Sequence, residues 1–574
     1  MRLLTFGKKS GFILFLVLAL LIAVFPARGT GRMQAGAGGV NSLDPKVAAE
    51  IDKIFADFDK PGSPGCVIGI LKDGRIVYAR GHGLANLEYG VPMTAETVSE
   101  SGSVAKQFTA AAVQILAAEG KLALDDDIRK YLPEVPVFGP VITVRRLLNH
   151  TSGLRDQWDL LDLEGRPAGS VAHTMDEILD LVSRQKDLNF KPGDEYLYSN
   201  TNYSLLAWIV RRASGQSLAD FSRERIFRPL GMIHTQWRDD YRRVVESRAA
   251  AYSAGPNGTF LQNMPFTNVY GNGGLLITMG DLLIWAENFW NPRVLGRERL
   301  DEMEAPGRLN DGSTITYGMG LGLSDYRGLR QVTHSGSTAG YRAYLVRFPG
   351  EHAAIAVLGN FGGVDGSDLA HKVADILLEG RLQEKPKVRP FKMAPDRLGQ
   401  LAGFYRNMKT DAALKLAVKG EGLVTQGVGR PLQLVPIASD RLITYNGTEY
   451  IFEPAGPAAP SGLRETPVSD PASTYVRVEQ ARPGPQKLAE YEGRYWSEEL
   501  DVTYSVAVQN GRLIVIRRPD PPVPLSPSYE DAFSPGGTSE IVLRFTRNAA
   551  GAVDGLSIYT GRVRHLKFVR QGMA

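Results

Sequence analysis

The sequence predicts an α+β protein in which one large domain is followed by two small all-β, barrel-like domains. In the large domain we expect an antiparallel sheet flanked by helices, together with an all-helical subdomain. Two observations predict this arrangement: β-prone runs lie on both sides of a helical stretch, and short β-like runs replace the helical pattern beyond residue 395. The chain of 574 residues is also too long for one core, since domains contain about 150 residues.

The first 29 residues have the pattern of an export signal. Three basic residues, Arg2, Lys8 and Lys9, precede an apolar run that ends at Phe25, and small residues follow at positions suited to cleavage. We therefore expect residues 1–29 to be a cleaved signal peptide and the mature protein to be exported, either periplasmic or secreted. The alternative is an uncleaved helix that anchors the protein in a membrane, although a run of about 15 residues is short for one.

Composition and charge exclude several classes of function. Removal of residues 1–29, which carry four basic and no acidic side chains, lowers the formal net charge from +4 to about zero. Lys and Arg do not cluster with aromatic residues, so we expect no nucleic-acid partner. The eight histidines are scattered, so a metal site is not expected. Cys66 is the single cysteine and is expected to be a buried, small apolar residue.

The large domain is expected to span residues 40–383. Asp44 followed by Pro45 is a helix start signal, and apolar residues continue from there at helical spacing. Lys72-Asp73-Gly74 has the composition of a hairpin turn between two β-prone runs. The helical pattern dominates from about residue 103 to 240, and strand patterns then return at residues 275–278, 341–348 and 353–358.

Residues 384–395 are rich in Lys, Arg and Pro and are expected to link the large domain to two β domains, at 395–480 and 485–574. An internal repeat indicates that these two domains are related: Leu401-x-Gly-x-Tyr405 recurs 90 residues later as Tyr491-x-Gly-x-Tyr495. We expect the Pro/Ala/Ser-rich stretch 454–485 to separate them.

Ser103 and Lys106 form a candidate catalytic pair at the expected start of a helix. Three positions apart on a helix, the hydroxyl and the amine lie on one face. A buried lysine can lose its proton and accept the proton of a serine hydroxyl, which is a poor nucleophile by itself. The helix N-terminus would offer N–H groups to a developing oxyanion. Alone, the pattern also fits a helix N-cap followed by a solvated lysine.

Two further stretches contain candidate site residues. Tyr198 and Asn200 directly precede an apolar helical run, where a phenol can relay a proton and an amide can hold a substrate carbonyl; a surface turn is the alternative. The stretch 333–340 precedes the strand at 341–348. Its glycine would let a substrate approach the strand edge, and His334 could hydrogen-bond that substrate. The alternative there is a flexible Gly/Ser turn. His150 is expected to be structural.

Together these motifs resemble the serine β-lactamase and penicillin-binding-protein superfamily, specifically its class C-like branch, which includes D-aminopeptidases, D,D-carboxypeptidases and carboxylesterases. The resemblance covers about residues 50–380 and keeps the family's order. The matching motifs are Ser103-Val-Ala-Lys106, Leu-Leu-x-His-Thr-Ser-Gly-Leu at 147–154, Tyr198-Ser-Asn200, Pro229-Leu-Gly-Met232 with Thr235, Gly273-Gly-Leu275 with Thr278 and Asp281, and His334-Ser-Gly336.

The resemblance implies a β-lactamase/transpeptidase-like large domain and a serine hydrolase that works through an acyl-enzyme. Ser103 would be the nucleophile, Lys106 the general base and Tyr198 the proton relay. The substrate-binding residues that it implies are Asn200, His334, Gly336 and Ser337, with the N–H groups of Ser103 and Ser337 as the oxyanion hole. It implies no metal and no organic cofactor. The expected partner is a small-molecule or short-peptide substrate, including peptides derived from peptidoglycan; the oligomeric state is not predicted.

One departure from the family pattern bears on the substrate. Many β-lactamases of this superfamily have Lys-Thr-Gly in place of His334-Ser-Gly336, and that lysine helps to bind a substrate carboxylate. Histidine is a weaker anchor, so the resemblance favours a D-aminopeptidase or D,D-carboxypeptidase-like peptidase, or an esterase. The alternatives are a β-lactamase proper and a non-catalytic receptor for penicillin or peptidoglycan. The C-terminal domains resemble lipocalin-like barrels, one of which is expected to lie over the cleft.

Overall fold

The computed structural model describes residues 40–384, 389–426, 431–445, 447–453, 459–467, 472–517, 520–536 and 541–572. The expected signal peptide, residues 1–29, lies outside the described residues. Among the helices of the described ranges, none combines the length and the apolar character that a membrane-spanning helix requires.

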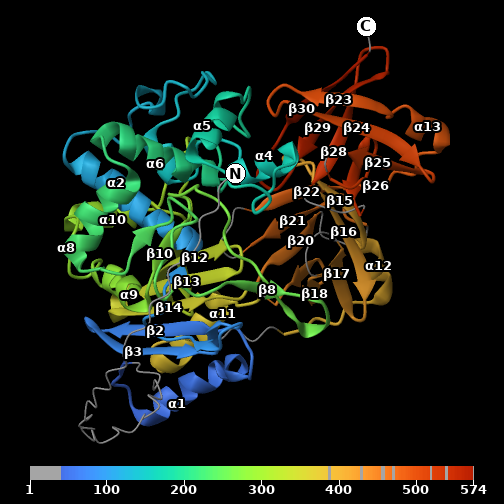
Figure 1. The fold of residues 1–574 in the computed structure, drawn as a ribbon. Coiled ribbons are helices and arrows are strands. Elements are labelled where there is room, and N and C mark those ends of the chain that lie inside the picture. The colour runs from blue at the N-terminus through green and yellow to red at the C-terminus, as the bar shows by residue number, and fades with distance from the viewer. Residues whose placement is uncertain are drawn as a thin grey trace, which may run out of the picture. The chain divides into compact units, whose positions relative to one another are not determined.

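The large domain contains a seven-stranded antiparallel sheet in the order β1-β3-β2-β14-β13-β12-β11 (Figure 1). β2 pairs with β14, so strands from both ends of the domain complete one sheet. The expected α+β arrangement is therefore confirmed. The strands are β1 (Val40–Asn41), β2 (Cys66–Lys72), β3 (Arg75–His82), β11 (Gly322–Tyr326), β12 (Leu329–Thr338), β13 (Tyr341–Phe348) and β14 (Ala353–Gly359).

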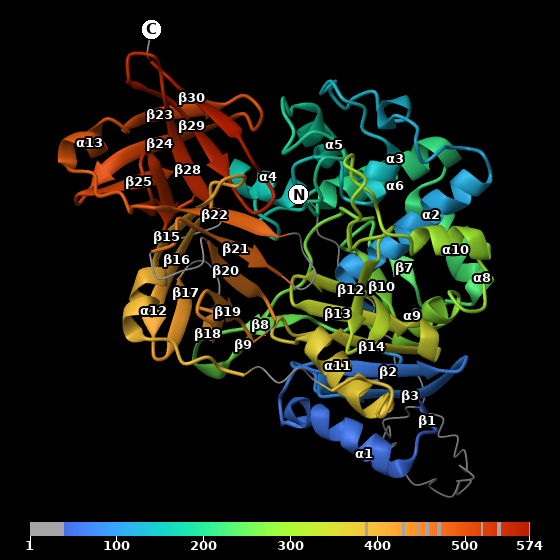
Figure 2. The ribbon, with the colours of Figure 1, turned by 180° about the vertical axis from the view of Figure 1, so that it is seen from behind.

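Helices cover both faces of this sheet. The helices of the large domain are α1 (Pro45–Ile54), α2 (Lys106–Ala118), α3 (Val144–Leu148), α4 (Gln157–Glu164), α5 (Met175–Ser183), α6 (Asn200–Ser214), α7 (Leu218–Ser222), α8 (Arg228–Leu230), α9 (Met279–Glu287), α10 (Arg297–Met303) and α11 (Gly366–Leu377). On one face, α1 and α11 pack around Ile68, Ile355 and Val373 (Figure 2). On the other face, α9 lies so close that a Cβ on Gly69 would be 2.4 Å from the Met279 sulfur. Because a strand's side chains alternate between faces, the apolar run in β2 is buried on both sides.

Short strands that do not belong to the main sheet accompany the helical region. The strand expected at 275–278 is β10 (Leu275–Ile277), but it pairs with β6 (Ser99–Glu100) and β7 (Gln236–Trp237) rather than with the main sheet. These short pairings provide partners for the backbone groups of buried connecting segments. Two further hairpins are β4 (Leu84–Asn86) with β5 (Val91–Pro92), and β8 (Tyr252–Ala254) with β9 (Phe260–Gln262).

Two closed antiparallel barrels of eight strands each follow the large domain, as expected (Figure 1, orange and red). A short helix precedes each barrel: α12 (Pro395–Leu401) and α13 (Pro485–Ala489). The first barrel contains β15 (Gly403–Asn407), β16 (Ala413–Lys419), β17 (Gly422–Gln426), β18 (Gln433–Ala438), β19 (Arg441–Ile443), β20 (Glu449–Glu453), β21 (Gly462–Thr466) and β22 (Ser473–Val478). The second contains β23 (Gly493–Ser497), β24 (Val502–Gln509), β25 (Arg512–Ile516), β26 (Val523–Pro527), β27 (Ala532–Pro535), β28 (Val542–Arg547), β29 (Val553–Tyr559) and β30 (Leu566–Arg570).

The sequence repeat corresponds to one helix-to-strand corner that both barrels contain. In the first barrel the Tyr405 hydroxyl donates to the Leu401 carbonyl at 2.7 Å, and in the second Tyr495 donates to Tyr491 at the same distance. The glycine between them has a φ of 148° in the first corner and 152° in the second, a backbone conformation that favours glycine. The motif therefore specifies this corner in each barrel.

The stretch 454–485 does not separate the two barrels, so that prediction is wrong. It contains β21 and β22, and β22 closes the first barrel by pairing with β15. Residues 454–458 and 468–471 within it lie outside the described residues. In β21 only Leu463 is buried, and in β22 none of the side chains is. These strands therefore lack the alternation of apolar and polar residues that reveals a strand in a sequence.

The second barrel shares its hydrophobic core with the large domain. Leu161 of α4 and Ile178 of α5 belong to the same buried cluster as Tyr504 and Leu566 of the barrel. The Tyr504 hydroxyl also donates to the Leu163 carbonyl at 2.6 Å. Burial of apolar surface is the main source of stability at such contacts, so this barrel and the helical region stabilise each other.

Candidate active site

Ser103 lies in a 3-10 turn, Gly102–Ala105, that leads directly into α2. The α-helix itself begins at Lys106 rather than at the expected Ser103, but the turn keeps the two side chains on one side. The Lys106 Nζ atom lies 3.1 Å from the Ser103 Oγ atom. The structure therefore places the predicted pair within hydrogen-bonding distance.

The Lys106 side chain is completely buried. Its Nζ atom lies 3.0 Å from the Asn200 Oδ1 atom and 2.5 Å from the Asn272 carbonyl oxygen. No carboxylate of the described residues is within ion-pair distance of it. Burial, opposed in part by the Asp156 charge, lowers the pKa of Lys106 well below its usual value. A buried amine with neutral partners is suited to accept a proton.

Tyr198 lies beside this pair. Its ring centroid is 4.8 Å from the Lys106 Nζ atom, and its side chain lines the same cavity as Ser103. Burial raises the pKa of Tyr198, an effect that the neighbouring Ser103 hydroxyl opposes in part. The phenol is therefore protonated at neutral pH and can pass a proton between the serine and a leaving group.

His150, expected to be structural, supports the segment that carries Tyr198. Its ring is buried, and its centroid lies 4.2 Å from that of the Tyr198 ring, with the two planes tilted by 33°. The His150 Nδ1 atom accepts a hydrogen bond from the Ser199 N–H at 3.2 Å. Burial lowers the pKa of His150 well below its usual value. The ring is thus neutral. Through its contacts with Ser199 and Tyr198 it holds the backbone of residues 198–200 in place.

The predicted Gly/Ser motif is part of β12 and not a turn before a strand. The chain turns only after it, where Ala339 has a φ of 50°. β12 passes so close to the serine turn that a Cβ on Gly336 would be 2.0 Å from the Ser101 carbonyl oxygen. Since only glycine permits this approach, Gly336 brings the backbone of Ser337 close to that of Ser103.

His334 lines the cavity, as the sequence favours, but its side chain is almost completely buried. The Tyr317 hydroxyl lies 2.9 Å from its Nε2 atom, and the Ser335 carbonyl lies 2.6 Å from its Nδ1 atom. Burial, with a smaller contribution from the Lys106 charge, lowers its pKa to about 4. His334 is therefore neutral at pH 7, and both ring nitrogens already have partners.

These residues surround a cavity of about 710 Å³. Ser103, Tyr198, Asn200, His334 and Ser337 line it, whereas Lys106 and Gly336 lie behind its wall. Within the described part of the chain, no group of three or more His, Cys, Asp or Glu side chains could hold a metal ion. The cavity can accept a small substrate next to Ser103.

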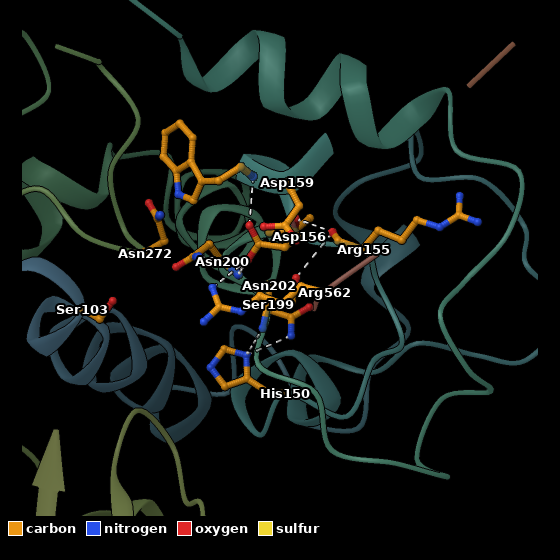
Figure 3. A network of polar contacts seen from close by, with 12 residues as sticks. Ser103, His150, Arg155, Asp156, Asp159, Ser199, Asn200, Asn202, Asn272 and Arg562 are labelled. Atoms are coloured by element: carbon orange, nitrogen blue, oxygen red, sulfur yellow. Dashed lines mark hydrogen bonds and ion pairs between the residues drawn. The ribbon is translucent and has the colours of Figure 1, made fainter. Parts of the chain in front are cut away.

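Sequence reasoning missed Asp156, which orients Asn200. The Asp156 Oδ2 atom accepts hydrogen bonds from the Asn200 backbone N–H at 2.6 Å and from its Nδ2 atom at 2.9 Å (Figure 3). The Asn200 oxygen consequently faces Lys106. Asp156 also caps α4, because its side chain accepts a hydrogen bond from the Trp158 N–H. Aspartate is a common helix-capping residue, so its position two residues after the 147–154 motif is the one signal for it in the sequence.

Arg562 also lines the cavity, although it belongs to the second barrel. It lies between β29 and β30, and its guanidinium is 5.0 Å from the Tyr198 ring centroid. An Nη atom of Arg562 lies 3.8 Å from the Asp156 Oδ2 atom (Figure 3). Nothing in the sequence signals this position, because it depends on how the barrel packs. The second barrel thus contributes a residue to the cavity wall; that a barrel lies over the cleft stays a prediction.

The site has the parts of an acyl-enzyme hydrolase: a serine, a buried amine, a phenol and closely approaching backbone N–H groups. A family model described as beta-lactamase matches residues 51–378. The chain belongs to the β-lactamase family, as its motifs predict, and is a serine hydrolase.

Known proteins extend the similarity beyond this domain. A D-aminopeptidase from Brucella anthropi is 27% identical, over 88% of this chain and 95% of the relative. The octameric penicillin-binding protein homologue from Pyrococcus abyssi has a TM-score of 0.54 and 26% identity, covering 75% of this chain and 99% of that protein. A D-amino acid amidase from Ochrobactrum anthropi SV3, complexed with L-phenylalanine amide, has a TM-score of 0.50 and 25% identity, covering 58% and 99%.

Proposed function

We propose that this protein is a serine peptidase or amidase that releases amines from short substrates containing a D-amino acid. The buried Lys106 amine, 3.1 Å from the Ser103 hydroxyl and without an acidic partner among the described residues, carries the chemical part of this proposal. The substrate class comes from the D-aminopeptidase relative, because its similarity extends over 88% of the chain and so into the barrels.

In the proposed reaction, the Ser103 Oγ atom attacks the substrate carbonyl carbon while its proton passes to the Lys106 Nζ atom. The backbone N–H groups of Ser103 and Ser337 stabilise the negative charge on the carbonyl oxygen. The proton on Lys106 then passes through the Tyr198 hydroxyl to the leaving amine, which departs and leaves an acyl group on Ser103 and a neutral Lys106 amine. A water molecule hydrolyses this ester, releasing the acid and the free serine.

We also propose that the protein acts after export, on small molecules or short peptides such as those derived from peptidoglycan. The basic and apolar pattern of residues 1–29 supports this location. The N-terminus of the protein isolated from its natural cell envelope or medium would test it. A start near residue 30 is expected, whereas an intact N-terminus in a membrane fraction would favour the anchored alternative.

Parallel assays with three substrate classes test the reaction: D-amino-acid amides, short-chain p-nitrophenyl esters and a chromogenic cephalosporin. We expect the highest kcat/KM for a D-amino-acid amide and a much lower value for its L-enantiomer. The neutral His334 offers no strong anchor for a lactam carboxylate. Fastest turnover of the cephalosporin would identify a β-lactamase instead. A Ser103 that binds penicillin without turnover of any substrate would identify a receptor.

A further inference from the structure

Two adjacent charged residues of the large domain, Arg155 and Asp156, have their oppositely charged partners in the second barrel. Both are buried. An Arg155 Nη atom lies 2.5 Å from the Glu499 carboxylate, and the Arg155 Nε atom donates to the Arg564 carbonyl at 3.1 Å. Asp156 lies 3.8 Å from the Arg562 guanidinium, and its N–H donates to the Arg562 carbonyl at 3.3 Å. The barrel therefore holds both residues by charge and by backbone contacts.

On its other side, the same dipeptide holds the segment that carries the catalytic candidates. The Arg155 carbonyl accepts a hydrogen bond from the Thr201 hydroxyl at 2.7 Å. The Asp156 carboxylate accepts both hydrogen bonds from Asn200. Because the Asn200 amide nitrogen donates to Asp156, the amide oxygen faces the Lys106 amine, at 3.0 Å from Nζ. A continuous set of contacts thus leads from the barrel to the base.

We propose that Glu499 of the second barrel is a positioning residue for proton transfer between Ser103 and Lys106. This inference rests on the proposed function, in which these two residues are the catalytic pair. Glu499 is 4% exposed, and its carboxylate also accepts from the Lys186 N–H at 2.8 Å, so it is fixed at the interface. Its loss would leave the Arg155 guanidinium buried without a counter-charge.

An uncompensated buried charge is strongly unfavourable, so the segment would shift or admit water to relieve it. Either response moves Asp156, and with it the Asn200 oxygen that Lys106 faces. Small displacements of catalytic groups have large effects: about 1 Å can cost on the order of 100-fold in rate. Glu499 therefore acts on the reaction through Arg155, Asp156 and Asn200, without touching the substrate.

The test compares Glu499→Gln with Glu498→Gln in the full-length protein. Glu498 is the matched control: it is the neighbouring residue, and it forms an ion pair with Lys186 at 2.9 Å in which both side chains are about 60% exposed (58% and 62%). Exposed ion pairs of this kind contribute little to the stability of the fold. The rate of Ser103 phosphonylation by a fluorophosphonate, which reports attack by the same hydroxyl that acylation requires, is measured for each variant, together with kcat, KM and thermal unfolding.

We expect Glu499→Gln to slow acylation and kcat about tenfold or more, with KM changed less than about twofold. Glu498→Gln should behave as the parent. In an Asp156→Asn background, Glu499→Gln should slow the reaction little further, because the effects of substitutions at residues that act through one another do not add. Acylation at the parent rate in Glu499→Gln, or multiplying effects in the double variant, would overturn the proposal.

Two further results separate the possible failures. If the parent protein is not labelled at Ser103, the proposed function fails rather than the role of Glu499. If Glu499→Gln does not fold, Glu499→Asp keeps the charge and withdraws the carboxylate by one methylene. That variant should fold and acylate more slowly than the parent; a parent-like rate would contradict a positioning role.

Discussion

At the scale of single residues, the candidate chemistry depends on two side chains that differ in how they are buried. Ser103 borders the cavity, whereas Lys106 lies behind its wall with neutral oxygen partners. A serine needs access to substrate, and an amine needs exclusion from water to act as a base near neutral pH. The 3-10 turn satisfies both needs with residues three positions apart.

Ser103→Ala should abolish turnover and leave the fold intact, because the hydroxyl is at a cavity edge and fills no core. We expect a loss of about three orders of magnitude or more in kcat/KM. Mass spectrometry after treatment with a fluorophosphonate should find a single adduct, on Ser103 of the parent. Full activity of the variant, with an adduct elsewhere, would contradict the assignment.

Lys106→Arg should be nearly inactive although the positive charge is kept. Guanidinium stays protonated at accessible pH and cannot accept the serine proton, and it is larger than the buried amine it replaces. A fall of about 1000-fold in the acylation rate is expected. Lys121→Arg, at a largely exposed lysine beyond the end of α2, is the control. Near-parent turnover in Lys106→Arg would show that the lysine acts only by its charge.

At the scale of elements, the site depends on the close approach of β12 to the serine turn. Gly336→Ala would place a methyl group 2.0 Å from the Ser101 carbonyl oxygen, so β12 must move away. We expect a destabilisation of about 1–3 kcal/mol and a marked loss of kcat, measured by chemical unfolding and steady-state kinetics. Gly350→Ala, where a Cβ meets no atom within 4 Å, should change neither quantity.

A second element-scale prediction concerns Asp159 in α4, which accepts a hydrogen bond from Thr560 of the second barrel at 2.5 Å. Burial, followed by the charge of Asp156, raises the pKa of Asp159 to about 6. The folded state therefore binds its proton more tightly than the unfolded state. Ionisation as the pH rises through 6 lowers stability, and below about pH 4 both states are protonated and this cost is absent.

Asp159→Asn removes this titration. It should raise the midpoint of thermal unfolding at pH 8, raise it less as the pH falls from 6 to 4, and leave it unchanged near pH 4. Asp162→Asn, at an exposed position of the same helix, is the control. A shift of equal size at both ends of the pH range would show that the effect is steric rather than electrostatic.

At the scale of the whole molecule, the second barrel is expected to be indispensable to the large domain. α4 and α5 share its hydrophobic core, and the buried Arg155 has its counter-charge there. Truncation after residue 384 would expose this apolar surface and leave that charge unpaired. We expect an insoluble or unlabelled product in the fluorophosphonate assay. A soluble, fully active fragment would show that the large domain is independent.

The sequence by itself determined the elements and residues that depend on local order. Near neighbours in the chain determine four such features: the hairpin turn at 72–74, the helix start at Asp44, the spacing of Ser103 and Lys106, and the corner motif of each barrel. The family motifs added the identity of the large domain. Each of these features is short-range along the chain, and so it leaves a pattern that can be recognised before any fold is known.

Only the tertiary structure decided which distant residues complete the site. Asp156, Arg562 and Glu499 are ordinary charged residues in the sequence, and their roles arise from burial and from partners hundreds of positions away in the chain. The same holds for β21 and β22, whose mixed composition hides their place in a closed barrel. Charge compensation and strand pairing at such separations depend on how folded units pack together, and no local pattern records that.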